Sequence, residues 1–353
     1  METMYIFILI TLAILAVTDL IVGVSNDAVN FLNSAIGSKA ISFKRIMIIV
    51  SVGIFLGAVF SSGMMEVARK GIFVPSLFYF DEIMIIFLAV MITDILLLDF
   101  FNTLGMPTST TVSIVFELLG SAVVMALLKI LVEGEREISS LTQYINTEKA
   151  TEIIVGILLS VFIAFFIGAI IQWISRLIFT FQYQGKMKIA GVIFGGLALS
   201  SIIYFVLYKG LKGTPYYGEF KDILESNLGF VLGIITLVSI LFSFVYTNLI
   251  KRNILVVIVG CGTFGLALAF AGNDLVNFIG VPMAAYHSFN AWMASGVDAS
   301  QFSMAGCIGT KSTGRITHID FFGWDYGGHS VAVKKSKDRH RYNDKFIKAR
   351  RSY

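Results

Sequence analysis

The chain carries Asn-Asp-Ala-Val-Asn at residues 26–30 and repeats it, with one change, as Asn-Asp-Leu-Val-Asn at residues 273–277. Each copy closes a long apolar stretch, and a cluster of carboxylate and amide groups is costly at membrane depth. Two copies therefore need a common reason to exist. Duplicated polar breaks in corresponding apolar segments are typical of carriers built from two repeats that share one midplane site. The sequence accordingly favours a membrane carrier.

The composition is that of an integral membrane protein. Hydrophobic residues make up 56% of the 353 residues, charged residues make up 14%, and the mean hydropathy is +0.82. This apolar share exceeds that of an ordinary soluble domain. We expect the protein in the cell membrane, either a plasma membrane or a bacterial inner membrane, with the lipid bilayer around it. The small net charge of +4 gives no sign of a nucleic-acid partner.

Eight apolar segments have the length, roughly 18 residues or more, that crosses a hydrocarbon core as a helix. The first is interpreted as a retained helix, because no Lys or Arg precedes Lys39 and the apolar run is too long for a secretory signal. The predicted fold is therefore all-α. The segments are 4–24, 43–62, 82–104, 109–131, 152–181, 189–208, 228–250 and 254–272.

If every segment spans fully, the two Asn-Asp motifs enter the membrane from opposite faces, as an inverted repeat requires. Glycine, proline and asparagine around residues 23–38, 102–111 and 272–282 also make broken helices or re-entrant hairpins plausible. The expected organisation is a first transporter repeat at 1–131, connecting helices and loops at 132–250, the start of a second repeat at 251–305, and an aberrant basic tail at 306–353.

The side chains of the two motifs offer the oxygen ligands that a small hard cation prefers, provided that the helix unwinds there. Asp27 is the expected charge partner of a sodium ion or a proton. The plainer alternative is an Asn-Asp cap at the start of a helix. The predicted polar residues of the two copies are Asn26, Asp27, Asn30, Asn273, Asp274 and Asn277.

A second motif, Gly-Met-Pro-Thr-Ser-Thr-Thr at residues 105–111, lies between two apolar segments. Pro107 in the first turn of a helix would present free N–H groups and hydroxyls at a helix N-terminus. Such an end attracts an oxyanion like phosphate through backbone donors and the helix dipole. The alternative is an ordinary Ser/Thr cap. The hydroxyl donors predicted for the anion are Ser109, Thr110 and Thr111.

Together these motifs resemble the PiT family of inorganic phosphate transporters, in which Gly-Ala-Asn-Asp-Val-Ala-Asn and Pro-Val-Ser-Thr-Thr-His each occur twice in inverted halves. The resemblance covers roughly residues 4–305. It implies symport of inorganic phosphate with sodium or protons by alternating access, with no cofactor beyond the cotransported ion. Sodium would bind at Asp27 and Asp274, and the hydroxyls of residues 109–111 would donate to phosphate. A homodimer is one possible assembly of the protein.

One departure from the family pattern bears on the cotransported ion. Val112 stands where the family usually has a histidine, and without an imidazole the choice tilts toward sodium. A phosphate dianion near two carboxylates is repelled by several kcal/mol at low effective dielectric. The carboxylates therefore need bound cations before the anion enters, which is a mechanism for coupling.

Other functions were weighed against a symporter. An anion channel could use the same helix end, and a non-transporting remnant is supported because no second Pro-Ser-Thr-Thr motif follows residues 273–277. An enzyme is not expected. Asp94 and Asp99 could suggest an intramembrane aspartyl protease, but no Gly-x-Gly-Asp occurs and five residues do not stack on one helical face. Glu117 is interpreted either as a proton or cation site or as a helix contact.

From residue 307 the apolar pattern stops and a stretch rich in Gly, His, Lys and Arg begins. One interpretation is a basic tail on an anionic inner leaflet. The hypothesis favoured here is a frameshift near Gly306, because back-translation from Lys311, read one base later, permits an apolar helix with a basic stop. Residues 307–353 would then have no evolved fold, and the chain would lack the second phosphate-binding helix end and transport poorly.

Overall fold

The computed structural model describes residues 2–59, 72–133, 140–180, 183–210 and 226–304, and within them the protein is helical. The extended pairing found in these ranges is limited to two isolated bridges, Phe73 with Ile145 and Tyr79 with Ser303. A helix satisfies its backbone N–H and C=O groups within one segment, as lipid surroundings require. The all-α membrane fold expected from the sequence is confirmed. The expected frameshifted tail lies outside the described residues.

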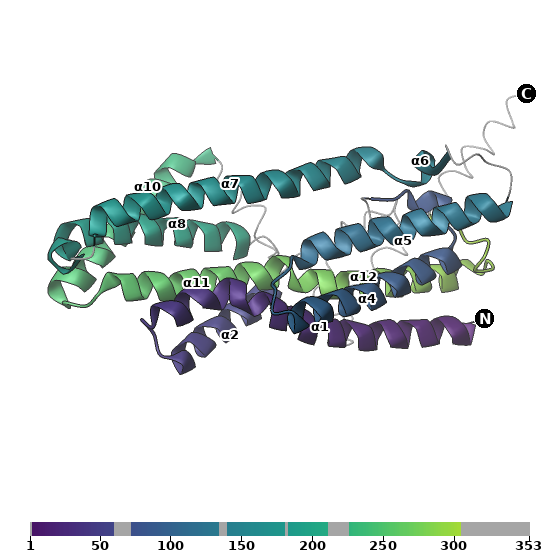
Figure 1. Ribbon diagram of the computed structural model, residues 1–353, viewed down its shortest axis with the longest axis horizontal. Helices are drawn as coiled ribbons and strands as arrows, with labels where there is room; N and C mark the ends of the chain where they lie inside the picture. The colour runs from purple at the N-terminus through teal and green to yellow at the C-terminus, as the bar shows by residue number, and fades with distance from the viewer. Residues whose placement is uncertain (1, 60–71, 134–139, 181–182, 211–225, 305–353) are drawn as a thin grey trace, which may run out of the picture. The chain divides into compact units, whose positions relative to one another are not determined.

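Figure 1 shows the arrangement of the helices in the described ranges. Two of them are flanked by π-helical turns, Met187–Gly191 before α8 and Val245–Leu249 after α10. In chain order the α-helices are α1 (Glu2–Ser38), α2 (Phe43–Val59), α4 (Phe80–Thr103), α5 (Thr110–Glu133), α6 (Leu141–Tyr144), α7 (Thr147–Phe179), α8 (Val192–Gly210), α10 (Leu228–Phe244), α11 (Ile254–Asn273) and α12 (Leu275–Ser295).

Seven helical segments of the described chain are long and apolar enough to cross a membrane, against the eight that the sequence predicted. The difference is α2, which has 17 described residues and ends at Val59, where the described range stops. A further helix, α12, was not among the predicted spans. It follows α11 so closely that Ile254–Ser295 forms one apolar segment of 42 residues.

The first Asn-Asp motif lies inside an unbroken helix, and the predicted unwinding at this position is wrong. Helix α1 runs for 37 residues through residues 26–30, about 55 Å at the usual helical rise. Ser25 keeps its hydroxyl satisfied by donating to the Ile21 carbonyl at 2.7 Å. The second motif does break its helix, because α11 ends at Asn273 and Asp274 forms the turn before α12.

Helices α1, α4, α5 and α12 pack together around the main hydrophobic core (Figure 1). Its aromatic centre stacks the rings of Trp292 and Phe80 with centroids 4.8 Å apart, and Tyr5 meets Trp292 edge-on at 5.1 Å. Edge and offset contacts of this kind add about 0.5–1.5 kcal/mol beyond the area buried. This core holds the start of α1 against α4 and the end of α12.

A second packing contact joins α2 to α11 through glycines. Gly53 and Gly57, four residues apart, face the backbone of α11. A Cβ at Gly53 would lie 2.9 Å from the Phe264 carbonyl oxygen, and one at Gly57 would overlap the Leu268 carbonyl oxygen. Small residues at this spacing let helix backbones approach closely, which is how helices associate where lipid is as apolar as their side chains.

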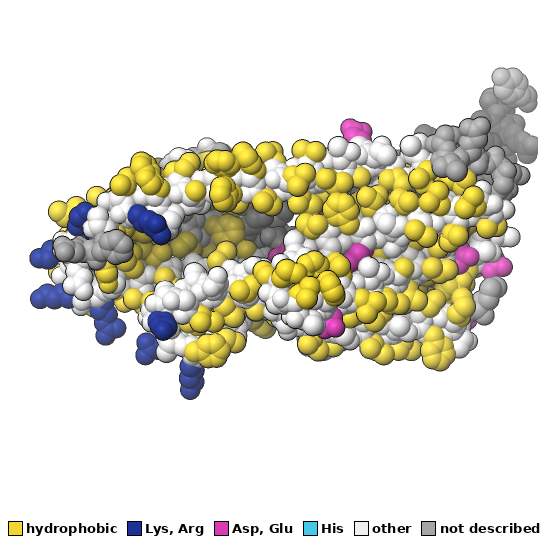
Figure 2. All heavy atoms as spheres, in the orientation of Figure 1, with side chains coloured by type: hydrophobic (Ala, Val, Ile, Leu, Met, Phe, Trp, Pro, Cys, Tyr) yellow, Lys and Arg dark blue, Asp and Glu magenta, His cyan; other side chains and the backbone are white. Residues whose placement is uncertain are grey.

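The outer faces of the helices are apolar. Hydrophobic side chains cover the face drawn in Figure 2, and none of the most apolar window of α7 is buried. An apolar helical stretch without buried residues is suited to lipid or to another apolar surface. Lys and Arg side chains gather at one end of the same view (Figure 2).

Candidate functional site

A tight turn between α4 and α5 positions the hydroxyl motif. Gly105 has φ +67°, a left-handed conformation that glycine adopts without steric cost. The N–H of Gly105 donates to the Asn102 carbonyl at 3.0 Å, and the N–H of Met106 donates to the Phe101 carbonyl at 3.0 Å. The chain thereby reverses direction, and α5 begins at Thr110.

Asn26 of the first motif holds this turn. Its amide nitrogen donates to the Asn102 side-chain oxygen at 2.8 Å and to the Met106 carbonyl at 3.2 Å. Its amide oxygen accepts from the Thr108 N–H at 2.8 Å. Asn102 in turn donates to the Val22 carbonyl at 3.0 Å. Asn26 thus ties α1 to the turn, which makes it a positioning residue.

Ser109 is the residue before α5, and its side chain is exposed. Its hydroxyl oxygen accepts from the Val112 N–H at 3.4 Å, as an N-cap residue does. Pro107 lies three residues before the helix, so its predicted place in the first helical turn is wrong. The helix start is set by the Ser109 cap and the turn at Gly105.

Thr110 connects the hydroxyl motif to the first Asn-Asp motif. Its hydroxyl donates to Asp27 Oδ2 at 3.4 Å, and the Asn30 amide donates to Asp27 Oδ1 at 3.2 Å. Thr110 is 2% exposed and Asp27 is 4% exposed. Asn30 itself is exposed at the edge of this contact. A buried carboxylate therefore lies directly against the first turn of α5.

Thr111 makes the equivalent connection to the second motif. Its hydroxyl donates to Asp274 Oδ1 at 3.0 Å and accepts from the Asn277 amide at 3.0 Å. Beside this contact Phe278 of α12 packs so closely on Gly23 of α1 that a Cβ at Gly23 would overlap its ring. Residues from three motifs far apart in the chain are thus in contact at the start of α5.

Of the nine residues expected at the site, five form this polar cluster. Asn26 acts on the turn beside it, while Ser109 and Asn30 are exposed at its edge. The Asn273 side chain lies outside the described residues. The five members of the polar cluster are Asp27, Thr110, Thr111, Asp274 and Asn277.

The polar cluster contains two carboxylates and no base. Asp27 interacts electrostatically with Asp274, and α1, α4, α11 and α12 contain no Lys or Arg. Like charges this close destabilise each other in a poorly solvated site. The arrangement therefore suits cations or protons bound at the carboxylates, with the threonine hydroxyls and the N-terminus of α5 available to an anion.

Sequence reasoning missed Asn102, which completes the hold of Asn26 on the turn. The signal in the sequence was an amide side chain at the end of an apolar segment, next to Gly105-Met106-Pro107. The alternative pair Asp94 and Asp99 is not assembled, because Asp94 is fully buried and Asp99 is exposed. Asp94 lies instead with Asp19 and Glu117 in a separate buried cluster.

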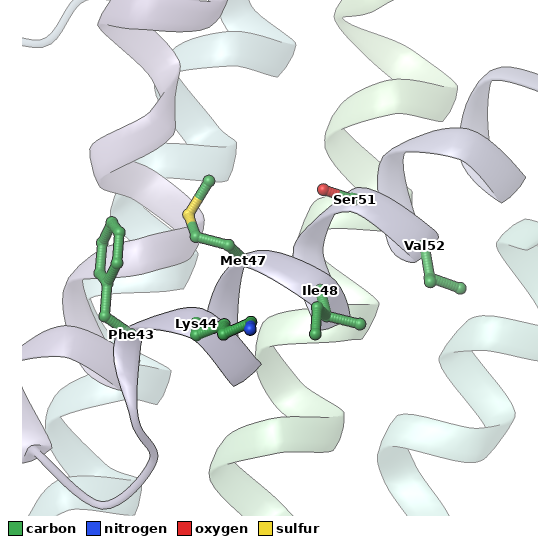
Figure 3. A pocket seen from close by; sticks show the side chains of 6 residues that line it. All are labelled: Phe43, Lys44, Met47, Ile48, Ser51 and Val52. Carbon is green, nitrogen blue, oxygen red and sulfur yellow. The ribbon is translucent and has the colours of Figure 1, made fainter.

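A surface depression of about 490 Å³ lies on α2 and not at the polar cluster (Figure 3). It is lined by Phe43, Lys44, Met47, Ile48, Ser51 and Val52, all from one helix. These side chains are mostly apolar and none belongs to the polar cluster. The depression is an open feature on the surface of α2.

Apolar helices that enclose a buried cluster of carboxylates, amides and hydroxyls define an integral membrane protein. The chain belongs to the phosphate transporter family, whose sequence profile matches residues 23–318.

Two relatives and one solved structure are similar to the chain. The chain is 28% identical over 291 residues to a predicted phosphate permease of Thermococcus kodakarensis and 28% identical over 275 residues to one of Pyrococcus abyssi. Each match covers 74% of this chain and 62% of the relative's length. The solved structure of "The sodium-dependent phosphate transporter" is 22% identical with a TM-score of 0.60, over 86% of this chain and 72% of that one. That likeness concerns the fold.

Proposed function

We propose that the chain transports inorganic phosphate across the cell membrane together with a cation, by alternating access. The observation that carries the proposal is the position of Thr110 and Thr111, which bring the first turn of α5 against Asp27 and Asp274. Both hydroxyls belong to a helix N-terminus, which favours anions. Both carboxylates favour cations. The names of the relatives, phosphate permeases, agree with the anion.

The residues divide into three roles in this proposal. Thr110, Thr111 and the free N–H groups at the start of α5 bind phosphate, with Ser109 at the entrance. Asp27 and Asp274 bind the cation, assisted by the amide oxygens of the motifs. Those amides belong to Asn30, Asn273 and Asn277, while Asn26 holds the turn.

The hydrogen bonds in the polar cluster provide a reason for coupling. Each threonine hydroxyl now donates its hydrogen to a carboxylate, so it cannot donate to phosphate at the same time. A cation on Asp27 or Asp274 takes over the carboxylate oxygens and cancels their repulsion of a dianion. The hydroxyls are then free for phosphate. Phosphate affinity should therefore rise with the occupancy of the cation site.

Sodium is the proposed cation. Val112 lies two residues from Thr110, where an imidazole would otherwise offer a site for a proton. The solved structure with the same fold is named as a sodium-dependent phosphate transporter. A hard monovalent cation suits carboxylate and amide oxygens.

The test is uptake of labelled phosphate into proteoliposomes that contain the 353-residue chain, with sodium and proton gradients imposed separately. An inward sodium gradient should drive phosphate above its external concentration. Asp27→Asn should abolish this uptake, and Asp99→Asn is the matched control because Asp99 is exposed on α4. Uptake that only equilibrates phosphate and ignores both gradients would indicate a channel, and absence of uptake and of binding would indicate a remnant.

A further inference from the structure

A second set of acidic side chains is buried between three helices, away from the Asn-Asp motifs. Asp19 of α1 and Asp94 of α4 are fully buried, and Glu117 of α5 is 9% exposed. Ser113, one turn before Glu117, is 6% exposed. Carboxyl groups are rarely this buried unless they are paired or neutralised. Asp19, Asp94 and Glu117 are called the carboxyl trio, and Ser113 is called the bridging serine.

The contacts of Ser113 restrict the charge of the trio. Its hydroxyl oxygen lies 2.6 Å from Asp94 Oδ1 and 2.6 Å from Glu117 Oε1. One hydroxyl has a single hydrogen, so it can donate to only one of these carboxyl oxygens. The other contact is a hydrogen bond only if that carboxyl group carries a proton and donates it to the serine. Two contacts this short therefore favour a protonated acid at Asp94 or Glu117 over two ionised groups.

The remaining oxygens of the trio lack donors. Both carboxyl oxygens of Asp19, Oδ2 of Asp94 and Oε2 of Glu117 are buried without a hydrogen-bond donor among the described residues. Asp19 interacts with Asp94 and with Glu117, and a hydrogen bond between two carboxyl groups again needs a proton. An unpaired buried charge costs several kcal/mol, so three ionised groups would force these helices apart.

The surrounding helices supply no Lys or Arg that could neutralise the trio. Lys129 is the single Lys or Arg on α1, α4, α5 and α12, and it pairs with Glu82 at 3.0 Å. It is twelve residues from Glu117, about 18 Å along the helix. The titratable groups that interact here are Asp19 and Asp27 from α1, Asp94 from α4, Glu117 from α5 and, through Asp27, Asp274 before α12.

We propose that Asp19, Asp94 and Glu117, bridged by Ser113, form a proton-binding site distinct from the Asp27–Asp274 cluster. Protons are the ligand that fits, because one Ser113 hydrogen cannot serve both carboxyl groups that it contacts and four carboxyl oxygens of the trio have no donor among the described residues. A proton shared within the trio lets α1, α4 and α5 remain packed. Its loss places two or more like charges in one apolar space.

The site is placed to influence the polar cluster. Asp19 and Asp27 are eight residues apart on α1, about 12 Å along the axis, and Ser113 follows Thr110 by one turn of α5. Asp94 also interacts electrostatically with Asp27. A protonated trio therefore repels the negative charge of Asp27 less than an ionised trio does. This link to cation binding rests on the proposed function, whereas proton occupancy of the trio does not.

Infrared difference spectroscopy of the purified 353-residue chain in lipid, without phosphate, tests the site. The carbonyl stretch of a protonated carboxylic acid should be present at neutral pH, shift in D₂O, and disappear as the pH is raised. Asp94→Asn and Glu117→Gln should each reduce this band, whereas Asp99→Asn on the same helix as Asp94 should leave it unchanged. The band should persist in Asp27→Asn, which separates the trio from the polar cluster.

Two results would overturn the proposal. One is the absence of a protonated carboxyl band from the unmodified chain at neutral pH, a measurement that needs no variant to fold. The other is removal of the band by sodium at constant pH, which would make the trio a cation site. Because phosphate is absent, failure of phosphate uptake affects the proposed function without affecting this experiment.

Discussion

The Thr111 hydroxyl donates to the Asp274 carboxylate at 3.0 Å, a contact between residues 163 positions apart. It joins the first turn of α5 to the break between α11 and α12. Its neighbour Thr110 contacts Asp27 of α1 at 3.4 Å. Two adjacent threonines thus connect the two copies of the Asn-Asp motif, and the predictions below begin from this contact.

Removing either threonine hydroxyl should weaken phosphate binding with little change in shape. Thr110→Val and Thr111→Val each delete one donor, and a hydrogen bond to a charged oxygen contributes about 1–3 kcal/mol, or roughly 5–150-fold in affinity. Equilibrium dialysis with labelled phosphate at saturating sodium measures the change. Thr93→Val is the matched control, because Thr93 is exposed and donates within α4. Equal affinity in all three variants would contradict a role in phosphate binding.

Ser109 should behave differently from its two neighbours. Its hydroxyl caps α5 by accepting from the Val112 N–H, and loss of a cap costs about 0.5–2 kcal/mol. Ser109→Ala should therefore lower the temperature of thermal unfolding, whereas Ser109→Asp, which can still cap, should restore it. If Ser109→Ala weakened phosphate binding and left stability unchanged, Ser109 would be a direct ligand instead.

Asn26 and Asn102 should be energetically coupled. Asn26→Ala or Asn102→Ala removes the hydrogen bond between the two side chains and leaves one buried amide group of the partner unsatisfied, which costs about 1–3 kcal/mol. The double variant should cost less than the sum of the two, because the same contact cannot be lost twice. A double-mutant cycle on the free energy of unfolding in detergent measures the interaction. Additive losses would show that the 2.8 Å contact contributes nothing.

Gly57 should be intolerant of even a single methyl group. Its Cβ would overlap the Leu268 carbonyl oxygen of α11, and overpacking of this kind typically costs about 1–3 kcal/mol. Gly57→Ala should therefore destabilise the protein in thermal unfolding. Gly120→Ala is the matched control, because nothing lies within 4 Å of a Cβ at Gly120 in α5. Equal stability of both variants would contradict the close approach of α2 and α11.

The end of the helices that gathers Lys and Arg should face the cytoplasm (Figure 2). Positively charged loops are retained on that side during insertion. In a chain with its two cysteines replaced by serine, Lys44→Cys should be protected from an impermeant thiol reagent in intact cells, and Glu148→Cys should react. Both positions are exposed in the structure. The reverse pattern would invert the assigned orientation.

Much of the fold was predictable from local sequence. Apolar runs long enough to span lipid predicted most of the helices, because each helix satisfies its own backbone and its length is a local property. The apolar segment predicted at 254–272 matches helix α11, which ends one residue later at Asn273. Residues 275–295 were missed as a helix because Asn277, Pro282, His287 and Asn290 interrupt the apolar pattern.

The candidate site was predictable in residue types but not in contacts. The duplicated motif and the hydroxyl run indicated which side chains to consider, since buried polar groups in apolar segments are costly and so are conspicuous. Their roles as ligands remain predictions. That Asn26 would hold a turn through Asn102 depended on packing between residues 76 positions apart, for which no local pattern exists.

The sequence by itself therefore determined that this is a helical membrane protein with two related polar motifs, because hydropathy and helix length act within single segments. Only the tertiary structure decided that α1 continues through its motif, that Thr110 and Thr111 contact the carboxylates of both motifs, and that Asp19, Asp94 and Glu117 share one buried space. These features depend on how helices distant in the chain pack against one another. Such packing is a property of the whole set of helices and not of any one of them.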